Sequence, residues 1–132
     1  MEKVLAFLKE NATFYFTTLD GDQPRVRPFG FVMEYDGMLC FAVGEHKATY
    51  AQLLKNPNVE ICAANQDRQW MRLRGRAVVV TSEKCVRKAF GIEPMLKELY
   101  NKESGLKLGI IGLEEAEVEF ACMDGAFEKY KL

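Results

Sequence analysis

The apolar residues of this chain follow two kinds of spacing, one helical and one alternating. Over residues 2–10, Val4, Phe7 and Leu8 recur at the spacing of one helix face, which predicts a helix. The residues that follow are rich in aromatic and β-branched side chains and predict three strands, at residues 12–19, 25–34 and 38–43. Short turns separate the three strands, so we expect them to form an antiparallel meander.

The centre of the chain predicts one short helix and two further strands. The helix begins at about residue 48 and ends at the Asn56-Pro57-Asn58 stop, because proline disfavours helical geometry in the residue before it. Strands follow at residues 59–65 and 69–81. In the second of these strands, a period of two places one set of residues on a buried face. That set is Met71, Leu73, Ala77 and Val79.

The last third of the chain mixes helix and strand. Two helical pieces are predicted at residues 84–90 and 94–100, followed by strands at residues 117–123 and 126–131. The glycines at positions 105, 109 and 112 are expected in turns. About six strands with short helices inserted between them indicate an α+β fold, mainly antiparallel, with one small barrel as a single domain over residues 1–132.

Composition and charge narrow the function classes. The 132 residues are 48% apolar and 28% charged, which is typical of a globular protein with one core. The 18 basic and 19 acidic residues leave a formal charge of −1, so we expect no nucleic-acid partner and no anionic membrane surface. The apolar stretches are too short to span a bilayer, and we expect a cytoplasmic protein.

Cysteine and histidine usage argues against a metal site. The four cysteines lie far apart in the sequence, at Cys40, Cys62, Cys85 and Cys122, and we interpret them as reduced, buried thiols. His46 is the only histidine, so the chain lacks the clustered ligands that zinc prefers. The acidic run at residues 114–119 is interpreted as a solvated face. Since no nucleophile–base pair stands out, a cofactor is expected to carry any reaction.

Three basic residues are candidates for phosphate binding. Arg25 and Arg27 stand near the start of the strand predicted over residues 25–34, and Lys47 precedes the next predicted helix. If this strand pairs with the one at 38–43, the ends farthest from their turn meet, and the three basic residues converge where the helix starts. Guanidinium forks, an ammonium and free helix N–H groups are suited to phosphate binding.

Four stretches of sequence resemble one known family. They are Gln-Pro-Arg-Val-Arg-Pro-Phe-Gly-Phe-Val from residue 23, Asp-Gly-Met-Leu-Cys-Phe-Ala-Val-Gly from residue 36, His-Lys-Ala-Thr-Tyr-Ala-Gln-Leu-Leu-Lys-Asn-Pro-Asn-Val-Glu from residue 46, and Trp-Met-Arg-Leu-Arg-Gly-Arg-Ala from residue 70. Together they resemble the pyridoxamine 5′-phosphate oxidase-like FMN-binding split barrels over about residues 3–82. The resemblance implies a six-stranded split barrel and a homodimer with two FMN sites at the subunit interface.

The resemblance also implies which residues bind FMN. They are Arg25, Val26, Arg27, Pro28, Phe41, Ala42, Val43, His46, Lys47, Gln69 and Trp70. In the family pattern the first four lie beside the flavin with an arginine toward the phosphate, and the next three follow the ring and the ribityl chain. In the same pattern Lys47 binds the phosphate, and Gln69 and Trp70 contact the cofactor of the partner subunit. His46 stands where the oxidase has a second phosphate-binding arginine, which implies a looser, pH-sensitive grip.

The expected function is that of an FMN-dependent oxidoreductase that passes a hydride or electrons to or from a small molecule. Nitroimidazole reductases belong to the same broad group, so a quinone or a nitro compound is an open candidate for the substrate. The chain ends Phe-Glu-Lys-Tyr-Lys-Leu without the oxidase's arginine- and histidine-bearing segment, so pyridoxamine phosphate oxidation is not expected. Two alternatives stay open: a non-catalytic flavin-binding or redox-sensing module, and a relative that uses haem or a deazaflavin.

Overall fold

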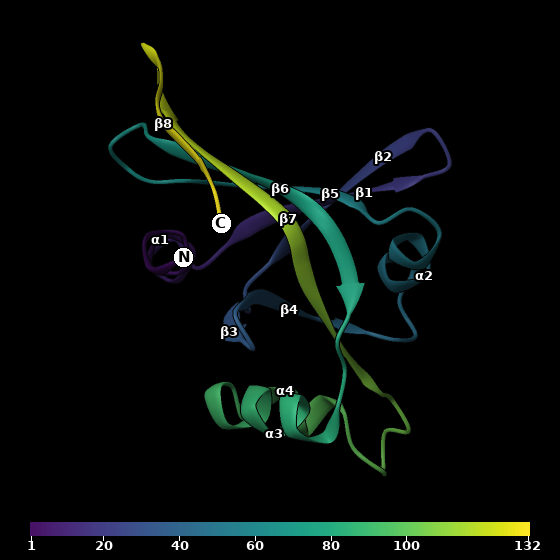
Figure 1. Cartoon of the computed structure of the whole chain (residues 1–132). Helices are drawn as coiled ribbons and strands as arrows, with labels where there is room; N and C mark the ends of the chain where they lie inside the picture. Colours follow the sequence, from purple (N-terminus) through teal and green to yellow (C-terminus); the bar gives the residue numbers. More distant parts are fainter.

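The computed structural model describes all of residues 1–132, in four helices and one eight-stranded sheet (Figure 1). The helices are α1 (Glu2–Glu10), α2 (Ala48–Lys55), α3 (Glu83–Ile92) and α4 (Met95–Leu99). The strands are β1 (Phe14–Asp20), β2 (Gln23–Phe29), β3 (Met33–Tyr35), β4 (Met38–Gly44), β5 (Asn58–Ala64), β6 (Trp70–Val79), β7 (Leu108–Cys122) and β8 (Gly125–Lys131). The four predicted helices are confirmed. None of them is long and apolar enough to cross a membrane.

All strands belong to one antiparallel sheet that curves into a split barrel. Along the sheet the order is β2-β1-β5-β6-β7-β4-β3, and β8 pairs with the C-terminal part of β7. β2 and β3 end this path without pairing with each other, which leaves the sheet open along one side. The predicted class, α+β and mainly antiparallel, is confirmed, with eight strands in place of about six.

The predicted meander is wrong, because the strand expected over residues 25–34 is two strands. β2 pairs with β1, whereas β3 pairs with β4, and residues 30–32 between them belong to neither strand. Val32 and Met33 are both buried, which the alternating side chains of a strand with one solvated face would not allow. The break therefore lets the chain pass from β2, beside β1, to β3, beside β4, with the side chains of Val32 and Met33 both in the protein interior.

Gly109 and Gly112 lie inside β7, which begins earlier than predicted. A Cβ on Gly109 would lie 2.8 Å from the Val43 carbonyl oxygen on β4, so glycine serves close packing here and not a turn. Gly105 does lie in a turn, with a φ of 70°. The close approach of β4 and β7 fixes the position of Val43, which lines the cavity described below.

A β-bulge interrupts the alternation predicted along β6. The pairing of β6 with β7 shifts register between Arg74 and Arg76, and Glu115 on β7 takes a left-handed φ of 51°. Leu73, before the bulge, is fully buried as predicted, but Val79 beyond it is 41% exposed. Because a bulge bends the strands and increases their local twist, the end of β6 turns away from the core. The burial predicted for Val79 is therefore wrong.

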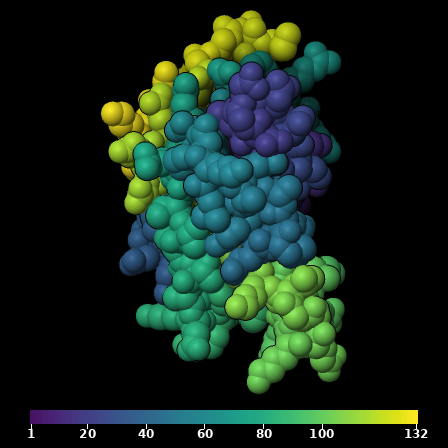
Figure 2. All heavy atoms as spheres, turned by 90° about the vertical axis from the view of Figure 1, so that its right-hand side faces the viewer, coloured from purple at the N-terminus to yellow at the C-terminus, as the bar shows by residue number.

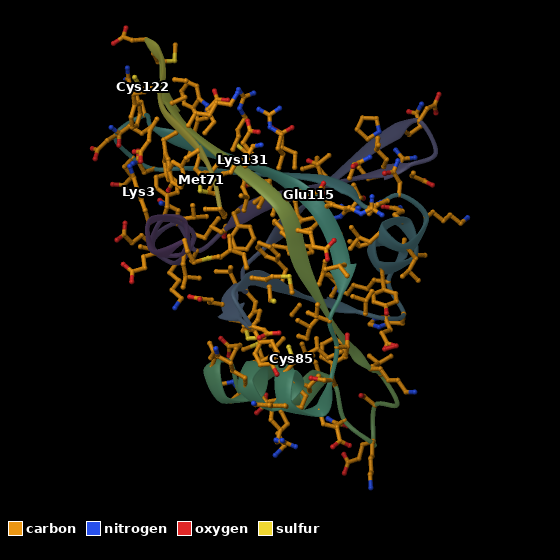
Figure 3. The ribbon with its side chains drawn as sticks, in the orientation of Figure 1. Lys3, Met71, Cys85, Glu115, Cys122 and Lys131 are labelled. Carbon is orange, nitrogen blue, oxygen red and sulfur yellow. The ribbon has the colours of Figure 1, made fainter.

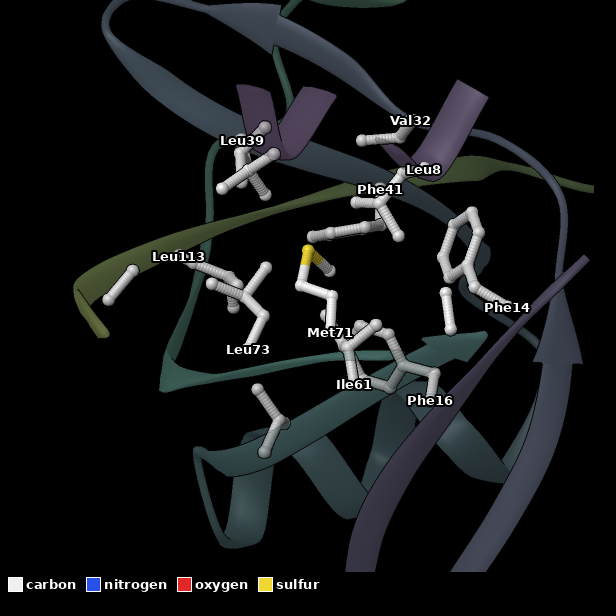
Figure 4. Close-up of a cluster of buried hydrophobic side chains, with 14 of the residues drawn as sticks. Leu8, Phe14, Phe16, Val32, Leu39, Phe41, Ile61, Met71, Leu73 and Leu113 are labelled. Atoms are coloured by element: carbon white, nitrogen blue, oxygen red, sulfur yellow. The ribbon is translucent and has the colours of Figure 1, made fainter. Parts of the chain in front are cut away.

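The barrel core is aromatic at its centre (Figure 4). The Phe41 ring centroid lies 5.8 Å from that of Phe14 and 5.4 Å from that of Phe16, both in edge-to-face contacts, and all three rings are fully buried. α1 closes one side of the core with Val4 and Leu8. The aromatic contacts hold β1 against β4, although these two strands are not paired in the sheet. They therefore fix the relative positions of two strands next to the cavity described below.

α3 and α4 cover a second, smaller cluster that includes Cys40 and Cys85. Burial raises the pKa of Cys40 to about 11, so its thiol stays protonated near neutral pH. Cys85 on α3 and Cys122 at the end of β7 lie at opposite ends of the molecule (Figure 3). All four cysteines are free, as predicted, although Cys62 and Cys122 are only half-buried.

Candidate functional site

A cavity of about 260 Å³ lies where the β2–β3 link, β4, α2 and α4 meet. Five of the residues predicted to bind a cofactor line it: Arg27, Pro28, Ala42, Val43 and Lys47. Figure 2 shows this side of the molecule, where α2 lies between the β1–β2 hairpin and the connection that follows α4. Segments far apart in the sequence therefore build one concave site.

The start of α2 forms a basic, donor-rich part of the cavity. Lys47 is the N-cap residue, and its extended backbone (φ −83°, ψ 149°) leads the chain into the helix. Its N–H donates to the Gly44 carbonyl oxygen at 3.1 Å, and no side chain caps the helix. The N–H groups of Ala48 and Thr49 therefore have no acceptor within the chain. Such free donors at a helix start favour an anion.

Arg27 lines the same cavity and is held in place by protein acceptors. Its Nη1 donates to the Phe16 carbonyl oxygen at 3.1 Å, and its Nη2 donates to Gln52 Oε1 at 3.0 Å. The buried Thr18 hydroxyl donates to the same amide oxygen at 2.6 Å. Burial lowers the pKa of Arg27. A guanidinium has more N–H groups than these two contacts use, so Arg27 is pre-positioned with donors left for a ligand.

Gln52 is a residue of the site that the sequence analysis missed. It lies on α2 one turn after Ala48, on the face that meets β1. That spacing was the available signal, but the sequence did not show that the strand predicted over residues 12–19 lies beside this helix. Arg27 and Lys47 do come together as predicted, yet they do so through β1 and α2. Of the expected pairing between residues 25–34 and 38–43, only the end that forms β3 exists, and β2, which carries Arg27, does not pair with β4.

Four predicted residues of the same chain do not line this cavity. Arg25 forms an exposed ion pair within the β1–β2 hairpin at 3.6 Å, and Val26 is 65% exposed on the edge strand β2. The Phe41 side chain is buried in the core, so its neighbours on β4 line the site instead. His46 is exposed, with its ring centroid 6.3 Å from that of Tyr100. Contacts of these residues with a cofactor stay a prediction.

Gln69 and Trp70 lie at the other end of the molecule, where β6 begins (Figure 1). Gln69 lines a separate cavity of about 430 Å³ together with residues of α1 and of the β7–β8 hairpin. Trp70 is half-buried and pairs with Ala121 of β7. Neither residue lines the cavity beside Lys47 within one chain. Their predicted contact with the cofactor of a partner subunit stays a prediction.

α4 supplies an apolar wall that the sequence analysis did not assign to the site. Leu96, Leu99 and Tyr100 line the cavity, and so do Phe29 and Phe31 of the β2–β3 link. A helix was predicted here, but apolar residues at helical spacing are equally typical of a core. Nothing in the sequence connects this segment with the start of α2, because the contact is made only by the folded chain.

The charged side chains of β6, β7 and β8 are largely paired with one another. Arg72 donates to Glu119 at 3.0 Å, while Arg74 and Lys129 lie 3.9 Å and 3.3 Å from Glu117. Part of the acidic run predicted as a solvated face thus forms a surface ladder of ion pairs. No three His, Cys, Asp or Glu side chains gather where they could hold a metal ion. The cavity beside Lys47 has no carboxylate in its lining, which suits it to binding an anionic group.

The comparisons with known proteins identify the family. The family model described as pyridoxamine 5′-phosphate oxidase matches residues 1–121. None of the curated proteins matches the chain. Among solved structures, a NimC/NimA family protein from Clostridium acetobutylicum is 35% identical with a TM-score of 0.90, over 100% of this chain and 93% of that one.

Two more distant structures share the fold. General Stress Protein 26 from Bacillus anthracis has 17% identity and a TM-score of 0.77, over 99% of this chain and 97% of that one. A pyridoxamine 5′-phosphate oxidase-related, FMN-binding protein from Nostoc punctiforme has 16% identity and a TM-score of 0.64, over 98% and 87%. The match of the family model to nearly the whole chain, on a split barrel of this topology, means that the protein belongs to the pyridoxamine 5′-phosphate oxidase family.

Proposed function

We propose that this protein binds FMN and works as a flavin-dependent oxidoreductase on a small molecule. The observation that carries the proposal is the meeting of Arg27, Lys47 and the free N–H groups at the start of α2 in one cavity. All of these groups are hydrogen-bond donors and two are positively charged, whereas no carboxylate lines the cavity. This donor set fits the phosphate of a flavin nucleotide.

The size of the cavity fits part of an FMN molecule. Its volume of about 260 Å³ lies below the range of about 300–1,000 Å³ that encloses a drug-sized ligand. The basic groups and the ribityl-facing strand β4 would hold one end of the cofactor, and the apolar side chains of α4 and the β2–β3 link would lie beside the other. The remainder would extend beyond this subunit, which agrees with a site shared between two subunits.

The chain's own residues would bind, orient and shield the cofactor. The flavin, when bound, supplies the hydride or electron transfer. Arg27 is immobilised by Phe16 and Gln52 and so would fix the phosphate without a large loss of side-chain freedom. No carboxylate or imidazole lines the cavity, which keeps a non-catalytic flavin-binding or redox-sensing module as the second candidate. We propose a nitro compound or a quinone as the electron acceptor.

Purified wild-type protein is expected to bind FMN much more tightly than riboflavin, because only FMN carries the phosphate. The measurement is quenching of flavin fluorescence by the apoprotein, with FAD as a third ligand. Anaerobic addition of NADH or NADPH to the FMN complex then follows the flavin absorbance. Bleaching would support the oxidoreductase, whereas a stable spectrum with both nucleotides would favour the sensor. Equal affinity for FMN and riboflavin would contradict the phosphate site.

We also propose that the protein is a cytoplasmic homodimer with cofactor sites at the subunit interface. The β1–β2 hairpin projects from the barrel, and Val26 and Tyr15 on it are exposed although they are large and apolar or aromatic. The outer face of β6 carries Trp70 beside arginines, a composition typical of an interface. Free cysteines suit a reducing compartment. Light scattering at micromolar concentration is expected to give twice the 15.1 kDa chain mass, and a monomer that still holds flavin would exclude the shared site.

A further inference from the structure

Tyr100 brings an uncommitted hydroxyl to the start of α2. It follows α4, and its ring packs against the cluster beneath α3 and α4. A Cβ built on Gly44 would lie 2.7 Å from the Tyr100 hydroxyl oxygen, so the phenol lies directly against the Gly44 backbone. Gly44 is also the residue whose carbonyl accepts the Lys47 N–H. The hydroxyl and the basic groups therefore belong to the same cavity.

Tyr100 is half-buried, and its hydroxyl makes no hydrogen bond within the chain but remains accessible to solvent, because every buried polar side-chain atom of the chain has a partner. An accessible phenol of this kind can donate its proton to water or to a bound ligand. Burial raises the pKa of Tyr100, so the phenol keeps its proton and remains a donor at neutral pH. No carboxylate lines the cavity to compete for that hydrogen bond, so an anionic ligand in the cavity would replace water as its acceptor.

We propose that Tyr100 is a further phosphate-binding residue, whose hydroxyl donates a hydrogen bond to the phosphate that Arg27 and Lys47 hold. The inference rests on the proposed function, since it adds a residue to the same phosphate site. The contact would tie the connection between β6 and β7 to the cofactor, because Tyr100 follows α4 within that connection.

The test compares Tyr100→Phe with wild type in binding FMN and riboflavin. The substitution keeps the packed ring and removes only the hydroxyl. A hydrogen bond to a charged group is expected to account for about a tenfold to hundredfold difference in affinity, so the Kd for FMN should rise by that factor. The Kd for riboflavin should change by less than about twofold, since it lacks the phosphate. The ³¹P resonance of bound FMN should also move.

Tyr50→Phe is the matched control. Tyr50 lies on α2 and is half-buried like Tyr100, but its ring packs against Gly109 and it does not line the cavity. Its loss of a hydroxyl should leave FMN affinity and the ³¹P resonance unchanged. Unchanged FMN affinity in Tyr100→Phe, or an equal loss for riboflavin, overturns the inference. Failure of the wild-type protein to bind FMN is a different result, because it overturns the proposed function and this inference together.

Discussion

Lys47→Ala is expected to weaken FMN binding by about 1.5–3 kcal/mol, the range for a hydrogen bond to a charged group. That free energy corresponds to a loss of about tenfold to a hundredfold in affinity. Lys47 lines the cavity at the N-cap of α2, and its ammonium would be the most mobile of the positive charges there. Riboflavin affinity should be barely affected, because no phosphate is present. Fluorescence quenching of both flavins by wild-type and variant apoprotein measures the difference.

Lys55→Ala is the matched control for this substitution. Lys55 is the last residue of α2 and is exposed, but it does not line the cavity. Its removal changes the net charge of the protein by the same amount, so any long-range electrostatic effect on FMN should appear in both variants. If the two alanine variants lose the same affinity, or if Lys47→Ala weakens riboflavin as much as FMN, Lys47 does not contact the phosphate.

Phe41→Ala is expected to lower the free energy of unfolding by about 3–5 kcal/mol, the usual cost of removing a buried aromatic side chain. Phe41 is completely buried and makes edge-to-face contacts with Phe14 and Phe16 at the centre of the barrel (Figure 4). Its loss leaves a cavity between β1 and β4, which no backbone pairing joins. Denaturant unfolding of the apoprotein, followed by circular dichroism, measures the change.

Phe127→Ala offers a comparison with the same chemistry at an exposed position. Phe127 lies on β8 and is 53% exposed, so its truncation should cost far less than that of Phe41. Similar losses for the two variants would contradict the central role given to Phe41. Measuring the FMN affinity of Phe41→Ala as well would distinguish a core role of Phe41 from a cofactor contact. A residue that served mainly as a cofactor contact would change FMN affinity more than apoprotein stability.

Local sequence patterns predicted the helices and most strands, because propensity and turn residues act over a few neighbours. The strand pairing could not be predicted in the same way. Consecutive strands with short turns favour a meander, but burial of both Val32 and Met33 breaks the strand there and sends the chain to β4. Gly109 was wrongly assigned to a turn for a similar reason. Position 109 requires glycine because the β4 backbone lies close to it in the fold, and its neighbours in sequence do not show this.

The candidate site was predicted where charge and local sequence determine it. Arg27 and Lys47 were found because a guanidinium, an ammonium and a helix start together are suited to phosphate binding, and both residues line the cavity. Gln52 and Tyr100 were missed because neither carries a charge or a motif, and their place depends on contacts between distant segments. The resemblance to a family extended the prediction to Ala42 and Val43, which no local pattern would have selected.

The long connection between β6 and β7 is structurally separate from the barrel strands. β6 and β7 pair directly with each other, so residues 82–106, with α3 and α4, leave and rejoin the sheet without adding a strand to it. A surface connection of this kind tolerates changes in length and sequence far better than the strands it joins. Changes within this one continuous stretch of gene can therefore alter the apolar wall of the cavity, while Arg27 and Lys47 on the barrel side remain as they are. An engineer can use the same division, provided that the buried anchors Cys85 and Ala89 and the cavity residue Tyr100 are kept.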